Sequence, residues 1–215
     1  MTSMSILDQS PIDTDETVRD GIARTVELAQ LADTENYTRY FVAEHHNIPE
    51  VAGTSPEILV THLLNQTKRI RVGSGGVMLQ HYSPFKVIEQ FHLISNIAPG
   101  RVDLGIGKAP GGFPLATQAL QSELKSPQTT FNEKFHLLNR FNKIPSPELY
   151  LLGGSENSAQ FAADEKVGFV YAFFINSNID VLHQSIKAYK AQYPEGRVIV
   201  GVATVVTESE SDKAL

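Results

Sequence analysis

Short apolar and β-branched runs recur along the chain and alternate with stretches in which apolar residues recur at helical spacing. The runs lie at 5–7, 40–43, 70–72, 102–106, 149–152, 169–175 and 198–206. The clearest helical faces are formed by Val18, Ile22, Val26 and Ala29, and by Leu182, Ile186, Tyr189 and Tyr193. Strict alternation of strands and helices predicts an α/β fold with parallel strands. Periodicity does not separate an open doubly wound sheet from a closed barrel.

Serine–proline pairs predict where two helices begin. Ser55 and Ser83 each precede a proline. A serine hydroxyl can accept a hydrogen bond at the N-cap, and a proline fits the first helical position because no N–H is needed there. Pro99 and Gly100 predict the end of the helix that begins after Ser83.

Composition and charge exclude several classes of protein. The chain has 18 Lys and Arg against 24 Asp and Glu, a net charge of −6 and no cysteine. An acidic surface argues against nucleic acid and anionic membranes as partners. The absence of cysteine excludes disulfides and cysteine-ligated metals. The longest apolar run, 169–175, is too short to span a membrane, and the N-terminus has no basic segment typical of a signal peptide. We therefore expect a cytoplasmic protein.

The first concentration of chemically capable side chains follows the second predicted strand, at Glu44, His45, His46 and Asn47. In parallel α/β folds, ligands bind at the carboxyl ends of the strands. Neighbouring strand residues point to opposite faces, so His45 and His46 are poorly placed to hold one metal ion. From position alone, one histidine is either a catalytic group or a hydrogen-bonded structural residue.

Glycine-rich segments follow the next strands. Gly73, Gly75 and Gly76 predict either a strand bulge or close approach of a flat ligand. Lys108 follows Gly105 and Gly107, in a segment that fails the dinucleotide-binding pattern because proline occupies the third glycine position. Lys108 is therefore either a phosphate-binding cation or an ordinary loop lysine.

A fourth segment, Gly153–Gly154–Ser155, joins the fifth strand to a helix. Free N–H groups and a hydroxyl at a helix N-terminus can bind an anion, although an ordinary N-cap explains Ser155 equally well. A ligand with one phosphate and one planar ring would suit these segments together, with Lys108 and Ser155 at the phosphate and the side-chain-free backbone at Gly75 against the ring.

Several of these segments, in chain order, resemble the bacterial luciferase-like flavin-dependent monooxygenases. The segments are Ser-Ile-Leu-Asp-Gln-Ser-Pro at 5–11, Val-Ala-Glu-His-His-Asn at 42–47, Arg-Val-Gly-Ser-Gly-Gly-Val-Met-Leu at 71–79, Pro-Gly-Arg-Val-Asp-Leu-Gly-Ile-Gly at 99–107 and Leu-Leu-Gly-Gly-Ser at 151–155. The closest likeness is to the branch whose chains begin with the Leu-Asp-Gln-Ser-Pro element.

The resemblance implies a (β/α)8 TIM barrel that works as a homodimer and binds reduced FMN at the carboxyl ends of its strands. A flavin reductase supplies the flavin. Oxygen then forms a peroxyflavin, which transfers one oxygen atom to a small organic substrate. A deazaflavin-dependent oxidoreductase of the same family and a non-catalytic flavin-binding barrel stay open as alternatives. A metallohydrolase is the weakest alternative, because no spaced histidine motif is present.

The resemblance also assigns roles to individual residues. His45 matches the catalytic histidine, with Glu44, His46 and Asn47 as groups that orient it or the flavin ring. Gly75 and Gly76 match a dipeptide that lines the ring and often has a cis peptide bond. Lys108 stands where relatives have a phosphate-binding arginine, and Ser155 matches the residue that caps the phosphate. Gly154, beside it, replaces an acid of the luciferases.

The length of the chain bears on whether the predicted barrel is complete. We predict one luciferase-like barrel domain over residues 1–215. Seven predicted strands followed by an acidic helix start at 208–212 are one strand fewer than a closed barrel requires. We therefore expect the barrel to continue beyond Leu215, and a loop segment to be missing between Phe141 and Pro145.

Overall fold

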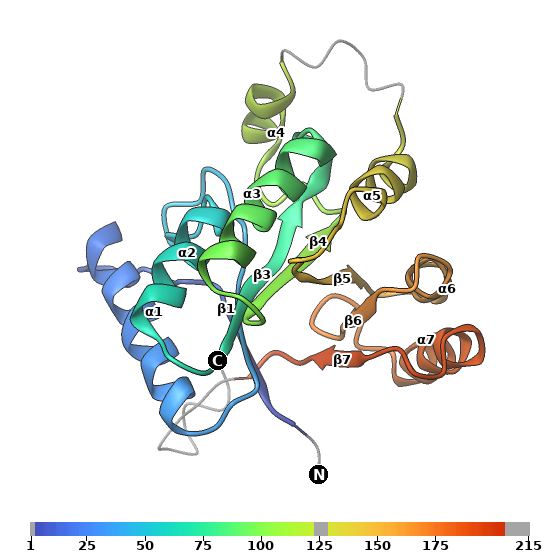
Figure 1. Ribbon diagram of the computed structural model, residues 1–215. Helices are drawn as coiled ribbons and strands as arrows, with labels where there is room; N and C mark the ends of the chain where they lie inside the picture. The colour runs from blue at the N-terminus through green and yellow to red at the C-terminus, as the bar shows by residue number, and fades with distance from the viewer. Residues whose placement is uncertain (1–2, 123–128, 205–215) are drawn as a thin grey trace. The chain divides into compact units, whose positions relative to one another are not determined.

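The computed structural model describes residues 3–122 and 129–204, and its elements alternate between strands and helices (Figure 1). The predicted acidic helix start at 208–212 lies outside these residues. The strands are β1 (Ser5–Asp8), β2 (Arg39–Val42), β3 (Arg71–Met78), β4 (Val102–Gly107), β5 (Glu148–Gly153), β6 (Gly168–Ala172) and β7 (Val198–Gly201). The helices are α1 (Val18–Thr34), α2 (Pro56–Gln66), α3 (Pro84–Ile97), α4 (Pro114–Gln121), α5 (Phe131–Arg140), α6 (Glu156–Asp164) and α7 (Ile179–Gln192), with a 3-10 turn, η1 (Leu79–His81).

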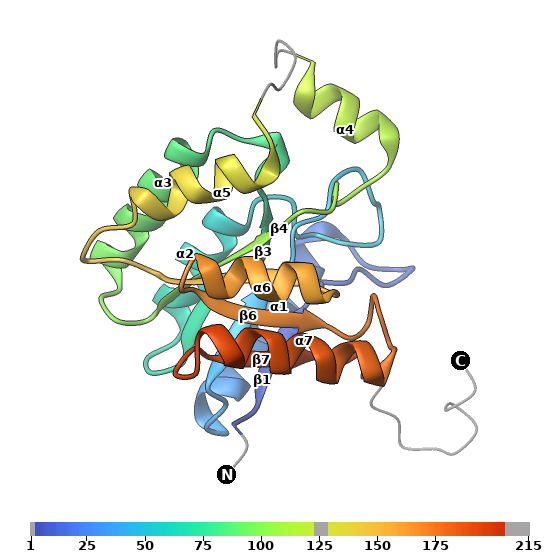
Figure 2. The same ribbon diagram turned by 90° about the vertical axis from the view of Figure 1, so that its right-hand side faces the viewer.

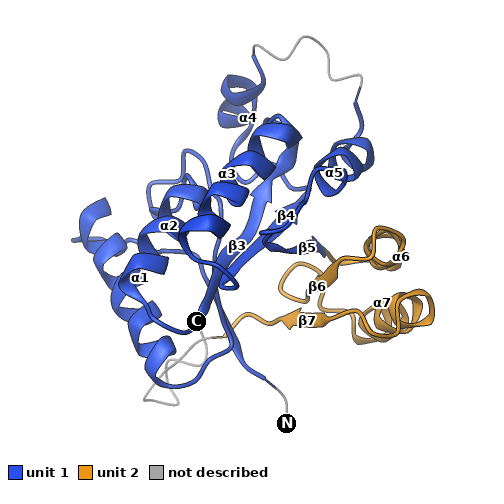
Figure 3. Ribbon diagram, in the orientation of Figure 1, with its two compact units in different colours: residues 1–152 blue, residues 153–215 orange. Residues whose placement is uncertain are grey.

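The chain forms two compact units, Met1–Leu152 and Gly153–Leu215, and each is described by itself (Figure 3). In the first unit, β1 to β5 pair in chain order and every pair is parallel. Helices α2 and α3 lie against β3 and β4 (Figure 1). In the second unit, β6 pairs with β7 in parallel, and α6 and α7 run side by side (Figure 2). The prediction of parallel strands is therefore confirmed within each unit.

Strand ends differ from the prediction by more than one residue at three places. β3 continues through its glycines to Met78, because they pair with β4 despite a shift in register between Gly75 and Val77. β6 ends at Ala172 rather than at 175, because the chain turns and the N–H of Ile175 bonds the carbonyl of Ala172 (3.0 Å). β7 ends at Gly201, within the predicted run.

The buried face of α1 matches the one that periodicity predicts only in part, at Ala29. Val18 is 55% exposed, whereas Gly21, Thr25, Ala29 and Ala32 are buried. The reason is a buried carboxylate at the end of β1. Asp8 accepts hydrogen bonds from the hydroxyls of Thr25 (2.8 Å) and Tyr40 (2.7 Å). This draws a polar helical residue into the core.

The two serine–proline pairs differ in the structure. Both prolines occupy the first helical turn, as predicted. The hydroxyl of Ser83, whose backbone is extended, accepts a bond from the N–H of Lys86 (3.4 Å). Ser55 makes no side-chain cap, and its backbone lies outside the extended region usual for an N-cap. Gly100, after α3, adopts a φ of +75°, which glycine tolerates without strain.

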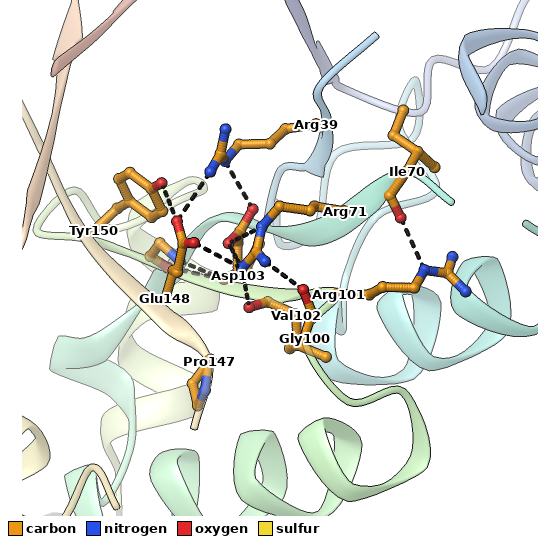
Figure 4. Close-up of polar contacts among 12 residues, drawn as sticks. Arg39, Ile70, Arg71, Gly100, Arg101, Val102, Asp103, Pro147, Glu148 and Tyr150 are labelled. Atoms are coloured by element: carbon orange, nitrogen blue, oxygen red, sulfur yellow. Dashed lines mark hydrogen bonds and ion pairs between the residues drawn. The ribbon is translucent and has the colours of Figure 1, made fainter. Parts of the chain in front are cut away.

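A charged cluster lies at the amino-terminal ends of β2 to β5 (Figure 4). The Asp103 carboxylate is fully buried and contacts Arg39 Nε (3.1 Å) and Arg71 Nη2 (2.5 Å). Glu148 contacts Arg39 Nη2 (2.9 Å) and accepts a bond from the hydroxyl of Tyr150 (2.7 Å). Burial raises the pKa of Asp103 to about 6, although Arg71 and Arg39 both act to lower it.

No helix within residues 3–122 and 129–204 is both long enough and apolar enough to cross a membrane.

Replacing Arg39 by methionine tests this cluster. The change leaves Asp103 with one guanidinium, so we expect the free energy of unfolding at about pH 8 to fall by about 3–5 kcal/mol. The pKa of Asp103 then rises further, and the folded state binds a proton that the unfolded chain does not. The loss of stability should therefore be smaller at about pH 5.5, as urea unfolding can measure.

The matched control is Lys86→Met, which breaks an exposed ion pair with Glu89 (3.3 Å). Its cost should stay below about 1 kcal/mol at both pH values. If Arg39→Met behaves like this control, the buried cluster does not carry the stability assigned to it.

Candidate functional site

A buried carboxylate connects the ends of β2 and β3. Glu44 is fully buried two residues after β2. Its Oε1 accepts a hydrogen bond from the hydroxyl of Tyr82 (2.8 Å) and lies 2.7 Å from Nε2 of His46. Its Oε2 accepts a bond from the N–H of Met78 (3.1 Å). A buried carboxylate needs such donors because it has lost its water, so Glu44 fixes the segments that supply them.

His45 makes none of these contacts. Its backbone N–H bonds the carbonyl of Gly53 (2.8 Å), while its ring Nδ1 is buried and has no hydrogen-bond partner in the part of the chain that the structure describes. Burial lowers the pKa of His45, and His46 lowers it further, whereas Glu44 acts in the opposite direction. The ring is therefore neutral at pH 7 and keeps one buried nitrogen available. Glu44 holds His46 by a hydrogen bond and influences His45 only electrostatically.

The peptide bond between Gly75 and Gly76 is cis, as predicted. A side chain at Gly75 would approach Cδ1 of Leu7 to 2.6 Å and Cβ of Phe41 to 2.9 Å. A side chain at Gly76 would lie 2.7 Å from the carbonyl oxygen of Gly105. Both glycines are thus required by close packing at the point where the register shifts, which gives the bulge interpretation a structural basis.

Lys108 directly follows β4 and is exposed. Its Nζ lies 5.9 Å from the centre of the Phe131 ring, within range of a weak cation–π interaction. The ammonium group therefore remains open to an anionic ligand.

Gly154 and Ser155 belong to the second unit. The Ser155 hydroxyl accepts a bond from the N–H of Ser158 (3.2 Å) and lies 2.6 Å from the Ser158 hydroxyl. The carbonyl of Gly154 accepts a bond from the side-chain amide of Asn176 (2.8 Å). Ser155 is thus the N-cap of α6, and the other N–H groups of the first turn lie next to it.

Sequence reasoning missed the groups that complete the Glu44 cluster. Tyr82 follows η1, and its neighbour His81 is buried, with Nε2 2.8 Å from the carbonyl oxygen of Pro110 and Nδ1 3.0 Å from Nε2 of Gln121. The rings of His46 and His81 meet edge to face, 5.7 Å apart. The sequence signal that could have found them is the His81–Tyr82 pair soon after the third predicted strand. Glu44 was identified in the same way, as a polar residue that follows a strand.

No group of three or more His, Asp or Glu suited to holding a metal ion occurs among residues 3–122 and 129–204. The site therefore has to be interpreted from the Glu44 cluster, His45 and the glycine segments.

Comparison with known proteins decides the family. The model of the luciferase-like monooxygenases matches residues 2–142. The chain belongs to this family. The N-acetyl-S-alkylcysteine monooxygenase of Bacillus subtilis is 48% identical over 214 residues, covering 91% of this chain. This luciferase-like chain spans only 64% of the length of that relative.

Solved structures confirm the predicted (β/α) barrel fold of the luciferase-like type. Apo-MsnO8 is 32% identical, with a TM-score of 0.85 over 94% of this chain and 66% of its own. The oxygenating constituent of 3,6-diketocamphane monooxygenase from Pseudomonas putida, solved with FMN, gives a TM-score of 0.73 over 92% of this chain and 63% of its own. At 18% identity, the second likeness shows the fold alone.

A double-mutant cycle tests the Glu44 cluster. Tyr82→Phe removes one donor from a buried carboxylate, so we expect the free energy of unfolding to fall by about 1–3 kcal/mol. In a Glu44→Gln background the same change should cost less, because the charge that the hydroxyl stabilises is gone. Thermal and urea unfolding of the four proteins measure the difference. Equal costs in both backgrounds would show that the two side chains are not coupled.

Proposed function

We propose that this chain is the catalytic barrel of a flavin-dependent monooxygenase that uses reduced FMN and O2 to add one oxygen atom to a small organic substrate. The observation that carries the proposal is the buried Nδ1 of His45, which has no hydrogen-bond partner among residues 3–122 and 129–204 and lies in a segment fixed by Glu44. A buried polar atom without a partner costs stability, and such atoms are expected where a ligand completes the hydrogen bonding.

The residues present fit FMN. We assign the flavin ring to the backbone at Gly75 and Gly76, as the family resemblance implies, and His45 offers a neutral nitrogen. In the first unit, Lys108 is the candidate for neutralising the phosphate. In the second unit, taken by itself, the N–H groups at Gly154 and Ser155 form a candidate anion-binding group at the start of α6. When bound, reduced FMN supplies the electrons that activate O2. Family membership supports this choice of cofactor.

The protein's own residues then have separate tasks. His45 holds or moves a proton at Nδ1, which a neutral imidazole can do near pH 7. Glu44 acts as a positioning residue, since it fixes the backbone of Met78 and the ring of His46 rather than contacting His45. Lys108 binds phosphate as a point charge, which is less specific than the forked guanidinium of an arginine.

The name of the Bacillus subtilis relative supports a substrate class. That protein is named for the oxygenation of N-acetyl-S-alkylcysteines, which are thioethers. At 48% identity, a small thioether is the first substrate to test on this chain. Incubation with reduced FMN, O2 and N-acetyl-S-methylcysteine should yield a product heavier by one oxygen atom. A product that forms only with a reduced deazaflavin would favour the oxidoreductase alternative, and flavin binding without any product would favour the non-catalytic one.

We also propose a homodimer that works in the cytoplasm and receives reduced FMN from a flavin reductase. Exposed apolar side chains on α2 and α3 support an interface between copies. Ile58 is 68% exposed and Leu93 is 65% exposed.

His45→Ala tests the catalytic assignment. Removing the imidazole should leave FMN affinity nearly unchanged, because the phosphate contacts stay, and lower the rate of oxygenation about 10²–10⁴-fold. Flavin fluorescence measures the affinity, and mass spectrometry of the product measures the rate. His62→Ala, an exposed change on α2, is the matched control and should alter neither quantity. An unchanged rate in His45→Ala would refute the assignment.

Lys108→Ala tests the phosphate assignment. Loss of one charge-assisted contact should weaken FMN binding about tenfold. Riboflavin has no phosphate, so its affinity should not change. Fluorescence titration with both flavins gives the comparison, with the exposed Lys86→Ala as control. An equal loss for FMN and riboflavin would place Lys108 away from the phosphate.

A further inference from the structure

A thioether of the protein itself lies at the carboxyl ends of β3 and β4. Met78 is the last residue of β3, and the register pairs it with Gly107, the last residue of β4. A Cβ atom at Gly107 would lie 3.1 Å from Sδ of Met78 and 3.2 Å from its Cε. A Cβ atom at Gly111 would lie 3.0 Å from Cγ of Met78. The Met78 side chain therefore fills the space that two glycines leave open.

This position is fixed from the backbone outward. The N–H of Met78 donates to the buried carboxylate of Glu44 (3.1 Å), and the residue stands two positions after the cis peptide of Gly75 and Gly76. Registered residues on neighbouring strands share one face of a sheet, so Met78 lies on the face that carries Gly105 and Gly107. Its sulfur is thus held against Gly107 of β4, while Gly75 and Gly76, to which we assign the flavin ring, lie two to three residues earlier on its own strand.

We propose that Met78 is an internal oxygen acceptor of this site and becomes methionine sulfoxide when no external substrate is bound. The inference rests on the proposed function. Its chemistry is that of thioether oxygenation: one atom of O2 bonds to Sδ, and the other leaves as water. Reduced FMN supplies two electrons and two protons and becomes oxidised FMN. The site thereby treats its own thioether as it treats a substrate thioether.

The oxidation changes the site in a defined way. A sulfoxide is polar and chiral, whereas the thioether packs between glycines as an apolar group. Turnover without substrate would therefore modify the site at one residue, and a methionine sulfoxide reductase would restore it. External thioether should protect Met78, because both compete for the same oxygen atom.

The sequence provides an internal control for diffusible peroxide. Its three methionines are Met1, Met4 and Met78, and trypsin separates the peptide 1–19 from the peptide 72–86, which contains Met78 alone. Met4 is 63% exposed, whereas Met78 is half-buried. Peroxide in solution should attack the exposed Met4 first. Oxygen transfer within the site should instead mark Met78.

The experiment supplies the 215-residue chain with FMN, a reductant and oxygen-18 gas, without external substrate. We expect the peptide 72–86 to gain one oxygen-18 atom about tenfold faster than the peptide 1–19, even with catalase present. Methionine sulfoxide reductases A and B each act on one epimer, so only one should reverse a modification made in a fixed geometry. Met4→Leu is the matched control and should leave the labelling of 72–86 unchanged.

A second measurement needs no turnover. Dilute hydrogen peroxide without reductant should oxidise Met78 in the free chain, and bound oxidised FMN should protect Met78 but not Met4. In the oxygen-18 experiment, two results would overturn the inference. One is labelling of the peptide 1–19 before the peptide 72–86, and the other is loss of the labelling of 72–86 when catalase is added. The inference would also be overturned if Met78 stayed unlabelled in a chain that binds FMN and oxygenates N-acetyl-S-methylcysteine. The proposed function would stand in that case. Failure to bind FMN at all would overturn both.

Discussion

A carboxylate withdrawn from water must be given hydrogen-bond donors, and this requirement at Glu44 organises the candidate site. The donors come from Tyr82, His46 and the backbone of Met78, so the ends of β2 and β3 and the segment after η1 are held together. With Glu44 committed to these partners, Nδ1 of His45 stays buried without a hydrogen-bond partner in the described part of the chain, and burial lowers the pKa of the ring. The reactive character assigned to His45 thus follows from where its neighbour's hydrogen bonds go.

The fold was largely predictable, because strand–helix alternation is a local property that the chain repeats. Sequence predictions failed where a contact with a residue distant in the chain determined the local structure. The apolar spacing in α1 predicted that Val18 is buried. Instead the Asp8 carboxylate, which is distant in sequence, bonds the hydroxyl of Thr25 and places Thr25 in the core. Ser55 and Ser83 both precede a proline, yet only Ser83 caps its helix with its side chain, and the backbone of Ser55 lies outside the extended region that Ser83 adopts.

The site was predictable to the extent that it lies in short segments at strand ends. His45 and Glu44 could be identified in this way, and the cis bond at Gly75 from the family resemblance. The same rule marks Tyr82 only as a polar residue near a strand end, because its role depends on a contact with a residue 38 positions earlier in the chain. Lys108 and Ser155 keep two interpretations in the structure as in the sequence, since an exposed cation and an N-cap are compatible with a phosphate without requiring one.

The charged cluster around Asp103 lies on the same face of the sheet as Gly105 and Gly107, but at the opposite end of the strands. Side chains at one end thus interact strongly with each other, while the other end presents glycine backbone. Such a separation favours evolvability: loops at the carboxyl ends can diverge and accept new substrates while the ion pairs that stabilise the strands stay unchanged.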